Sequence, residues 1–237
     1  MGNVVAVIPA RGGSKGIPGK NLKEINGLSL VARSVIATTR CKNIDSVYVS
    51  SDSDNILDEG KRYGALEHKR SGEAAADTAS TEDALDDFLD RFPNSEKPEV
   101  VVYLQCTSPF LDPEELENAI SYLADNPEID TVFSAKPFHG FLWQNVVESH
   151  RSTGINHTFE QGRARRQDLV GEQLLEDGAF YVLRVSSYIS THNRFGKNPY
   201  AFRSSVQPYN EIDAINDLEI ARLVHSFFDD RYLISDK

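Results

Sequence analysis

The segment of residues 8–21 concentrates side chains that can bind phosphate groups. It contains four glycines, one serine, one arginine and two lysines, in the order Ile-Pro-Ala-Arg-Gly-Gly-Ser-Lys-Gly-Ile-Pro-Gly-Lys-Asn. Glycines allow backbone N–H groups to approach a phosphate closely, and the cationic side chains neutralise its charge. The order matches neither a Walker A loop, because Asn21 follows Lys20, nor the dinucleotide-binding fingerprint. The segment therefore predicts a phosphate-binding loop of another kind, and a solvated loop with scattered charge is the alternative.

Two acidic residues near the other end of the sequence could hold a divalent cation. Glu211 and Asp213 alternate along a segment that precedes the last expected helix. Carboxylate oxygens at this spacing are suitable ligands for Mg²⁺ beside a triphosphate. Without any other motif, however, two acids before a helix N-terminus are better explained by the helix dipole. Asp217, which follows them, fits a first-turn helix acid.

Strands and helices alternate along the chain, and this alternation determines where both segments lie. We expect strands at residues 4–8, 46–50, 100–104, 131–135 and 179–183, and a weaker one at 201–206. We expect helices at residues 30–39 and 54–63, after a capping Thr81, after Asp112-Pro113, and at 216–228, where Asn216 and Glu219 have capping-box spacing. Such alternation is typical of an α/β fold with a mostly parallel, doubly wound (Rossmann-like) sheet. Ligands bind beyond the carboxyl ends of such strands, so we expect the site in the loops after Ile8, Val49 and Leu104.

Length and composition favour one large domain that carries a small excursion. The chain has 237 residues, of which 40% are hydrophobic, and this is enough to bury one sizeable core. Between residues 137 and 176 the strand and helix periods stop, and aromatic residues, histidines and a basic cluster appear instead. We therefore expect a single domain over residues 1–237 with an inserted excursion at 137–176.

The overall charge restricts the partners of the protein. A net charge of −11 repels a phosphate backbone and argues against a nucleic-acid partner, although a local basic pocket can still bind a small anion. No segment approaches the roughly 20 apolar residues of a membrane span, so we expect no membrane partner. Cys41 and Cys106 do not have the spacing of a metal-binding or redox motif, and the first strand is not preceded by a basic leader. Both observations favour a cytoplasmic location.

The order of residues in the first loop closely resembles the nucleotide-binding signature of the acylneuraminate cytidylyltransferases, the CMP-sialic acid synthetases. Later segments resemble further motifs of that family in order and at comparable spacing; they are residues 103–110, 166–169, 178–181 and 211–213. The related synthetase for the eight-carbon acid Kdo usually lacks the Gly-Gly-Ser-Lys sequence of the first loop. The sialic acid branch is therefore the better fit.

The resemblance implies the transfer of CMP from CTP to an N-acylneuraminate, with Mg²⁺ as cofactor and release of pyrophosphate. It implies that the nucleotide is bound by Arg11, Gly12, Gly13, Ser14, Lys20, Asn21, Arg70 and Ser80. It implies that the sugar is bound by Gln105, by Tyr181 and, through its carboxylate, by Arg166. It assigns the metal to Asp213 and Glu211, and the catalytic roles to Arg11, Lys20 and Asp213. The excursion would pack on a second subunit of a homodimer and reach into its site.

Several alternatives stay open at this point. Glu211 departs from the usual Asp-x-Asp pair of the family, and Asp177 stands where the family often has asparagine. The acceptor could therefore be another acidic sugar, such as legionaminic acid, pseudaminic acid, Kdn or Kdo. A nucleotide-binding module without catalysis is the alternative from a different class. For single residues, Arg70 could be a surface charge and Tyr181 a plain core residue.

Overall fold

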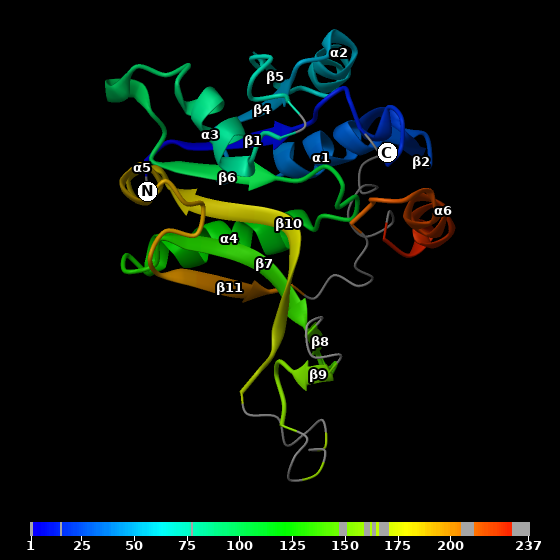
Figure 1. Cartoon of the computed structure of the whole chain (residues 1–237). Coiled ribbons are helices and arrows are strands. Elements are labelled where there is room, and N and C mark those ends of the chain that lie inside the picture. The colour runs from blue at the N-terminus through cyan, green and yellow to red at the C-terminus, as the bar shows by residue number, and fades with distance from the viewer. Residues whose placement is uncertain are drawn as a thin grey trace.

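The computed structural model describes residues 2–14, 16–76, 78–146, 151–158, 162, 165, 171–204 and 211–228. A seven-stranded sheet with the order β11-β7-β10-β6-β1-β4-β5 lies at its centre (Figure 1). These strands are β1 (Val4–Pro9), β4 (Ser46–Ser51), β5 (Leu66–Lys69), β6 (Val100–Leu104), β7 (Thr131–Pro137), β10 (Leu174–Arg184) and β11 (Pro199–Arg203). Strand β10 runs antiparallel to β6 and β7, whereas every other neighbouring pair is parallel. The mostly parallel sheet is thus confirmed.

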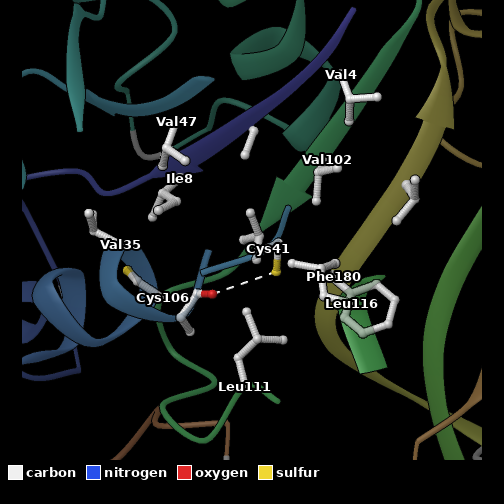
Figure 2. Packing of buried hydrophobic residues seen from close by; sticks show 14 of the residues in the cluster. Val4, Ile8, Val35, Cys41, Val47, Val102, Cys106, Leu111, Leu116 and Phe180 are labelled. Atoms are coloured by element: carbon white, nitrogen blue, oxygen red, sulfur yellow. Dashed lines mark hydrogen bonds between the residues drawn. The ribbon is translucent and has the colours of Figure 1, made fainter. Parts of the chain in front are cut away.

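Helices cover both faces of this sheet. They are α1 (Leu30–Thr39), α2 (Asp54–Arg62), α3 (Thr81–Leu89), α4 (Pro113–Asp125), α5 (Val185–Thr191) and α6 (Ile215–Val224). Along β1, Val4, Ala6 and Ile8 pack in a cluster with residues of α1, α2 and α4 (Figure 2), while Val5 and Val7 pack with α3 and α5. The apolar run of β1 is continuous because both of its faces are buried. The fold is therefore the doubly wound, Rossmann-like α/β class expected from the sequence.

In a third apolar cluster, α6 packs against the first loop. It contains Ile17 of that loop, Phe110 of the loop after β6, and Ile212, Leu218 and Ala221 of the carboxyl-terminal part. Helix α6 consequently lies beyond the carboxyl ends of β1 and β6 (Figure 1). The short elements η1 (Lys20–Leu22), β2 (Glu24–Ile25) and β3 (Leu28–Ser29) connect the first loop to α1. Apolar packing therefore brings together loops that lie at opposite ends of the sequence.

Two of the expected helix starts were wrong by one or two residues. The cap of α3 is Ser80 rather than Thr81: its Oγ accepts a hydrogen bond of 3.1 Å from Asp83 N, and Asp83 Oδ2 accepts one of 2.7 Å from Ser80 N. Helix α6 begins after Ala214, and Asp217 accepts the backbone N–H of Ala214, so the capping box expected from Asn216 and Glu219 does not form. An aspartate in the third helical position replaces the glutamate of the usual pattern in both helices.

The last strand was also misplaced. It was expected at residues 201–206, but β11 spans Pro199–Arg203 and pairs in parallel with β7. Residues 205–210 lie outside the described part of the chain.

The described residues of the excursion expected at 137–176 form an arm that projects from the sheet (Figure 1). Strand β7 runs to Pro137, which pairs with Leu174 at the beginning of β10. Between them, β8 (Trp143–Val146) and β9 (Arg151–Gly154) form an antiparallel hairpin. None of the helices in the described ranges has the length and apolar character that crossing a lipid bilayer requires.

Candidate active site

The first loop and the segment before α6 meet at one cavity. Lys20 Nζ lies 3.2 Å from Asp213 Oδ1 and donates a hydrogen bond of 2.7 Å to the carbonyl oxygen of Ile212. Both charged side chains line an open cavity of about 400 Å³, which we call the large cavity. The Lys20 side chain is 15% exposed and that of Asp213 is 70% exposed. The cavity thus contains an anchored cation and a carboxylate that is accessible to a ligand.

Close backbone contacts hold Asp213 at this position. A Cβ atom on Gly16 would lie 2.5 Å from the carbonyl oxygen of Asp213, so a larger residue at position 16 would displace this segment. Ile212 N donates to the carbonyl oxygen of Thr107 over 2.9 Å, and the Ile212 side chain is fully buried. The segment of residues 212–213 is therefore fixed between the first loop and the loop after β6.

Asn21 stabilises the first loop from inside. Its Nδ2 donates to the carbonyl oxygen of Arg11 over 2.9 Å, and its Oδ1 accepts a hydrogen bond of 3.1 Å from Cys106 Sγ. Burial raises the pKa of the Cys106 thiol to about 12, so the thiol stays protonated and can donate. Asn21, Arg11 and Ser14 all line the large cavity. Asn21 is only 5% exposed, and each end of its amide makes a hydrogen bond, so it holds the backbone of Arg11 in place.

The two adjacent glycines of the first loop do not line this cavity. Gly12 N donates a hydrogen bond of 2.8 Å to Asp52 Oδ1, from the loop after β4. A Cβ atom on Gly13 would meet nothing within 4 Å. A phosphate at the Gly12 amide would have to replace the Asp52 carboxylate, a partner that the sequence did not indicate.

Arg70 is a buried part of the cavity wall and not a surface charge. It is 8% exposed and lines the large cavity. Its Nε donates to Ser50 Oγ over 3.1 Å, and its Nη2 donates to the carbonyl oxygen of Ser50 over 2.9 Å. Ser80 lines the same cavity and caps α3 with its hydroxyl. Arg70 and Ser80, the two residues expected to contact the base or the ribose, therefore both lie where such contacts are possible.

Gln105 faces the large cavity from the end of β6, as expected. Its backbone N–H donates to the carbonyl oxygen of Ala179 over 3.2 Å. A Cβ atom on Gly178 would approach Gln105 Oε1 to 3.2 Å, and Gly178 has a φ of +71°, which other residues rarely adopt. Gly178 therefore gives the side chain of Gln105 its space.

Tyr181 does not line a sugar pocket, contrary to its expected role. It is 2% exposed and lies in the apolar cluster of α3 and α5, with its ring centroid 5.7 Å from that of Phe195. Its hydroxyl donates a hydrogen bond to Glu176. Tyr181 lines neither the large cavity nor the smaller cavity that adjoins it. The alternative of a core tyrosine is the one that the structure supports.

A second cavity of about 260 Å³ adjoins the large one, and Glu211 lines both; we call it the small cavity. Lys136 is the only basic residue among its described lining residues. Burial lowers the pKa of the Lys136 amine, while the charges of Asp177 and Glu211 act in the opposite direction. Asp177 is held in place by Ser134 Oγ, which donates to it over 2.5 Å. Lys136 was not predicted from the sequence, because a lone lysine in a strand has no recognisable pattern.

The acidic pair supplies two carboxylates, and they differ in character. The pKa of Glu211 is raised, first because burial disfavours its charged form and second because Asp213 adds a like charge. Within the ranges that the structure describes, no group of three or more His, Cys, Asp and Glu side chains is arranged to hold a metal ion. The pair fits Mg²⁺ only together with oxygens from another source, such as phosphate oxygens and water.

Two further residues complete the comparison with the sequence. Thr107 lines the large cavity, and its Oγ1 is buried without a hydrogen-bond partner among the described residues. Its motif was recognised in the sequence, but no role was assigned to it. Arg166, expected to bind the sugar carboxylate, lies outside the described residues, so its role stays a prediction.

Comparisons with known proteins identify the family of the chain. The model of the family described as cytidylyltransferase matches residues 5–222. An N-acylneuraminate cytidylyltransferase of Oncorhynchus mykiss is 38% identical over 76% of this chain and 41% of its own length. N-acylneuraminate cytidylyltransferase A of Danio rerio is 37% identical over 92% of this chain and 49% of its own length. The CMP-N,N'-diacetyllegionaminic acid synthase of Legionella pneumophila is 30% identical, over 86% of this chain and 85% of that protein.

Among solved structures, a CMP:2-keto-3-deoxy-manno-octonic acid synthetase complexed with CTP has the same fold. Its TM-score is 0.71 at 18% identity, over 95% of this chain and 99% of that one. The chain spans less than half the length of the two fish proteins, at 41% and 49%. The family match nevertheless extends over nearly all of the sequence, from residue 5 to residue 222. The chain belongs to the cytidylyltransferase family.

Proposed function

We propose that this chain transfers CMP from CTP to an N-acylneuraminate and thereby forms CMP-sialic acid and pyrophosphate. The observation that carries the proposal is the presence of Lys20, Asp213, Arg11 and Arg70 around one open cavity. The names of the fish relatives support the reaction, and the nucleotide named for the structural neighbour supports CTP.

The large cavity is the proposed nucleotide site. Arg11 and Lys20 would neutralise the triphosphate, and Ser14 lies beside them in the lining. Arg70 and Ser80, which also line this cavity, would contact the base or the ribose. Arginine can offer two parallel N–H groups to one acceptor group, which suits recognition of a planar base.

The small cavity is the proposed acceptor site. Glu211 lines both cavities, so a sugar in the small cavity would have its reacting end at the junction with the nucleotide. Gln105 would hydrogen-bond a sugar hydroxyl from the nucleotide side without adding charge. Lys136 would offer its amine to an oxygen of the sugar in a pocket that otherwise carries carboxylates.

We also propose Mg²⁺ as the cofactor. Asp213 would be its main ligand because its carboxylate is exposed to the cavity, and Glu211, which also lines the cavity, would be a second ligand. The bound ion supplies charge neutralisation on the triphosphate, and phosphate oxygens would complete its ligands.

In the proposed reaction, the anomeric hydroxyl oxygen forms a bond to the α-phosphorus while the bond from that phosphorus to the pyrophosphate oxygen breaks. The hydroxyl proton passes to the Asp213 carboxylate or to a water at that carboxylate. Lys20 stabilises the negative charge that develops on the leaving pyrophosphate. Catalysis then consists mainly of positioning and electrostatic stabilisation.

The arm is the proposed dimerisation element. Its hairpin projects from the sheet, and Trp143 is 50% exposed and Val146 40% exposed on it. Such apolar side chains would be covered by a second copy of the chain in a homodimer. Arg166 would then reach the site of the other subunit and bind the sugar carboxylate. A cytoplasmic location and the absence of a nucleic-acid partner complete the proposal.

One other acceptor has specific support. The Legionella pneumophila relative, named for N,N'-diacetyllegionaminic acid, is covered over 85% of its length. Asp177, which stands where the sialic acid branch often has asparagine, lines the small cavity and therefore the proposed acceptor site. The same reaction on legionaminic acid is thus the second candidate.

Pyrophosphate release measured with CTP, Mg²⁺ and a panel of acidic sugars tests the proposal. We expect release with N-acetylneuraminic acid and none without a sugar. The highest kcat/KM on legionaminic acid would replace the first candidate by the second. Absence of release with every sugar, from a protein that binds CTP, would refute the transferase proposal.

A further inference from the structure

Behind the nucleotide side of the large cavity, four polar side chains form a row that leads away from Arg70. Arg70 Nε lies 3.1 Å from Ser50 Oγ, and His68 Nδ1 lies 2.9 Å from the same Ser50 Oγ. On the far side of the imidazole, His68 Nε2 lies 3.6 Å from Asp87 Oδ2. Ser50 is fully buried, and His68 and Arg70 are 7% and 8% exposed. No function has been assigned to His68 or Asp87 so far.

The chemistry of these atoms fixes the direction of each hydrogen bond. Arg70 Nε can only donate, so Ser50 Oγ accepts from it. The single hydroxyl proton of Ser50 has no other acceptor among the described residues, so it is donated to His68 Nδ1. Nδ1 must then be unprotonated. The proton of the neutral imidazole is consequently on Nε2, which faces Asp87.

We propose that neutral His68 is a positioning residue for nucleotide binding, because through Ser50 it holds the guanidinium of Arg70 in the orientation that the cavity requires. This inference rests on the proposed function, in which Arg70 contacts the CTP. With Nε and Nη2 both bound to Ser50, the Nη1 atom makes no hydrogen bond to the described residues and is left for a ligand. Protonation of His68 would add a donor at Nδ1, where Ser50 needs an acceptor, and would weaken CTP binding.

The surroundings of His68 favour its neutral form. Burial is the main cause of a lowered pKa at His68, and Arg91 and Arg70 lower the pKa further. The charge of Asp87 acts in the opposite direction. From α3, the Phe88 ring meets the imidazole edge-on at a centroid distance of 5.4 Å. The folded protein therefore keeps the required tautomer at neutral pH and loses it only in acid.

A nucleophilic role of the same residues is excluded by the geometry. Serine, histidine and aspartate in one row resemble a hydrolytic triad in residue type. Ser50 Oγ is fully buried, however, and accepts the Arg70 Nε–H, so it is neither accessible to a substrate nor free to attack one. The row can act on the cavity only through Arg70.

Calorimetric titration of the full chain with CTP tests the inference. His68→Leu keeps the volume but removes the acceptor, and we expect Kd for CTP to rise about tenfold, as for loss of a hydrogen bond to a charged group. His68→Asn retains an acceptor near the Nδ1 position and cannot gain a proton, so it should bind CTP as the wild type does at pH 7.5. The exposed His192, replaced by asparagine, is the matched control and should bind CTP unchanged.

The pH dependence separates positioning from simple packing. As the pH falls from 7.5 through the pKa of His68, which burial holds below the usual value of 6.5, wild-type affinity for CTP should fall more steeply than that of His68→Asn. The nucleotide titrates in the same way with both proteins, and only the wild type has the imidazole. Equal slopes would overturn the inference. If His68→Leu does not fold, ¹⁵N NMR of wild-type His68 decides instead: a proton on Nδ1 would also overturn it.

Arg70→Ala distinguishes the failure of this inference from failure of the nucleotide assignment. Weak CTP binding by Arg70→Ala together with normal binding by His68→Leu would refute the role of His68 and leave the nucleotide site standing. Normal binding by Arg70→Ala would remove Arg70 from that site, and the inference with it. Neither result depends on which sugar the protein uses.

Discussion

Lys20 Nζ contacts Asp213 Oδ1 at 3.2 Å, although the two residues are 193 positions apart in the sequence. The contact exists because the apolar cluster of α6 places the carboxyl-terminal segment against the first loop. Ile212 between them is fully buried, and Lys20 also binds its carbonyl oxygen. A cation and a carboxylate that share a cavity can bind a phosphate and its metal side by side. Without this contact the proposed reaction would have no site.

Replacement of Lys20 by alanine should abolish most of the activity. Lys20 is the anchored cation of the large cavity, so its loss leaves charge on the leaving pyrophosphate without stabilisation. We expect kcat to fall by about 10² to 10³, as for removal of a donor from an oxyanion site. Lys23→Ala, at an exposed lysine of the same part of the chain, should leave pyrophosphate release unchanged. Normal turnover by Lys20→Ala would refute the catalytic assignment.

Gly16→Ala should impair catalysis without removing any functional group. The added Cβ would lie 2.5 Å from the carbonyl oxygen of Asp213 and would push this residue from its position. A displacement of about 1 Å costs on the order of 10² in rate when a positioned group is involved. Gly72→Ala is the matched control, since its Cβ would meet nothing within 4 Å and no role in binding is assigned to Gly72. Equal activities of the two variants would show that Asp213 tolerates displacement.

The sequence predicted the sheet well, for a physical reason. The runs that form β1 and β6 are apolar without alternation because helices bury both of their faces. The same property explains the wrong prediction for Tyr181. On a strand with two buried faces, hydrophobic periodicity does not tell which face a side chain joins, and Tyr181 joined the cluster beside α3.

Partners that are distant in sequence were beyond prediction. Asn21 forms hydrogen bonds with Arg11 and Cys106, and Gly12 forms one with Asp52. These contacts arise only when segments that are separate in the sequence meet in the fold. The starts of α3 and α6 were predicted wrongly because the side chain that accepts the hydrogen bond from the N-cap backbone N–H is an aspartate and not the usual glutamate. In α6 this aspartate is Asp217, the acid expected in the first turn.

Asp217→Asn should reduce stability, and the loss should depend on pH. Asp217 Oδ2 accepts the N–H groups of Ala214 and Asp213 at 2.8 and 3.0 Å, and these hydrogen bonds lower the pKa of its carboxyl below the ordinary value of an aspartate. A lowered folded-state pKa means that this contribution is present above pH 3.8 and is lost as the pH falls through the folded value.

Urea unfolding measures this effect. At pH 7 we expect Asp217→Asn to unfold with about 0.5 kcal/mol less free energy, because asparagine keeps an acceptor oxygen but loses the negative charge beside the helix N-terminus. Towards pH 3 the difference from the wild type should shrink. Glu219→Gln is the control, because Glu219 is exposed and, among the described residues, pairs with Arg222 of the same helix. A difference that persists unchanged in acid would contradict the role of the Asp217 carboxylate.

Lys136→Met should weaken acceptor binding and leave nucleotide binding intact. Lys136 lines the small cavity and not the large one, and methionine fills a similar volume without the charge. We expect KM for the acidic sugar to rise about tenfold, as for loss of a hydrogen bond from a charged donor, with KM for CTP unchanged. Because burial already disfavours the charged amine, the thermal midpoint should not fall. Lys42→Met, at an exposed lysine, should change neither KM. A rise in KM for CTP alone would place the acceptor elsewhere and assign the small cavity to the nucleotide.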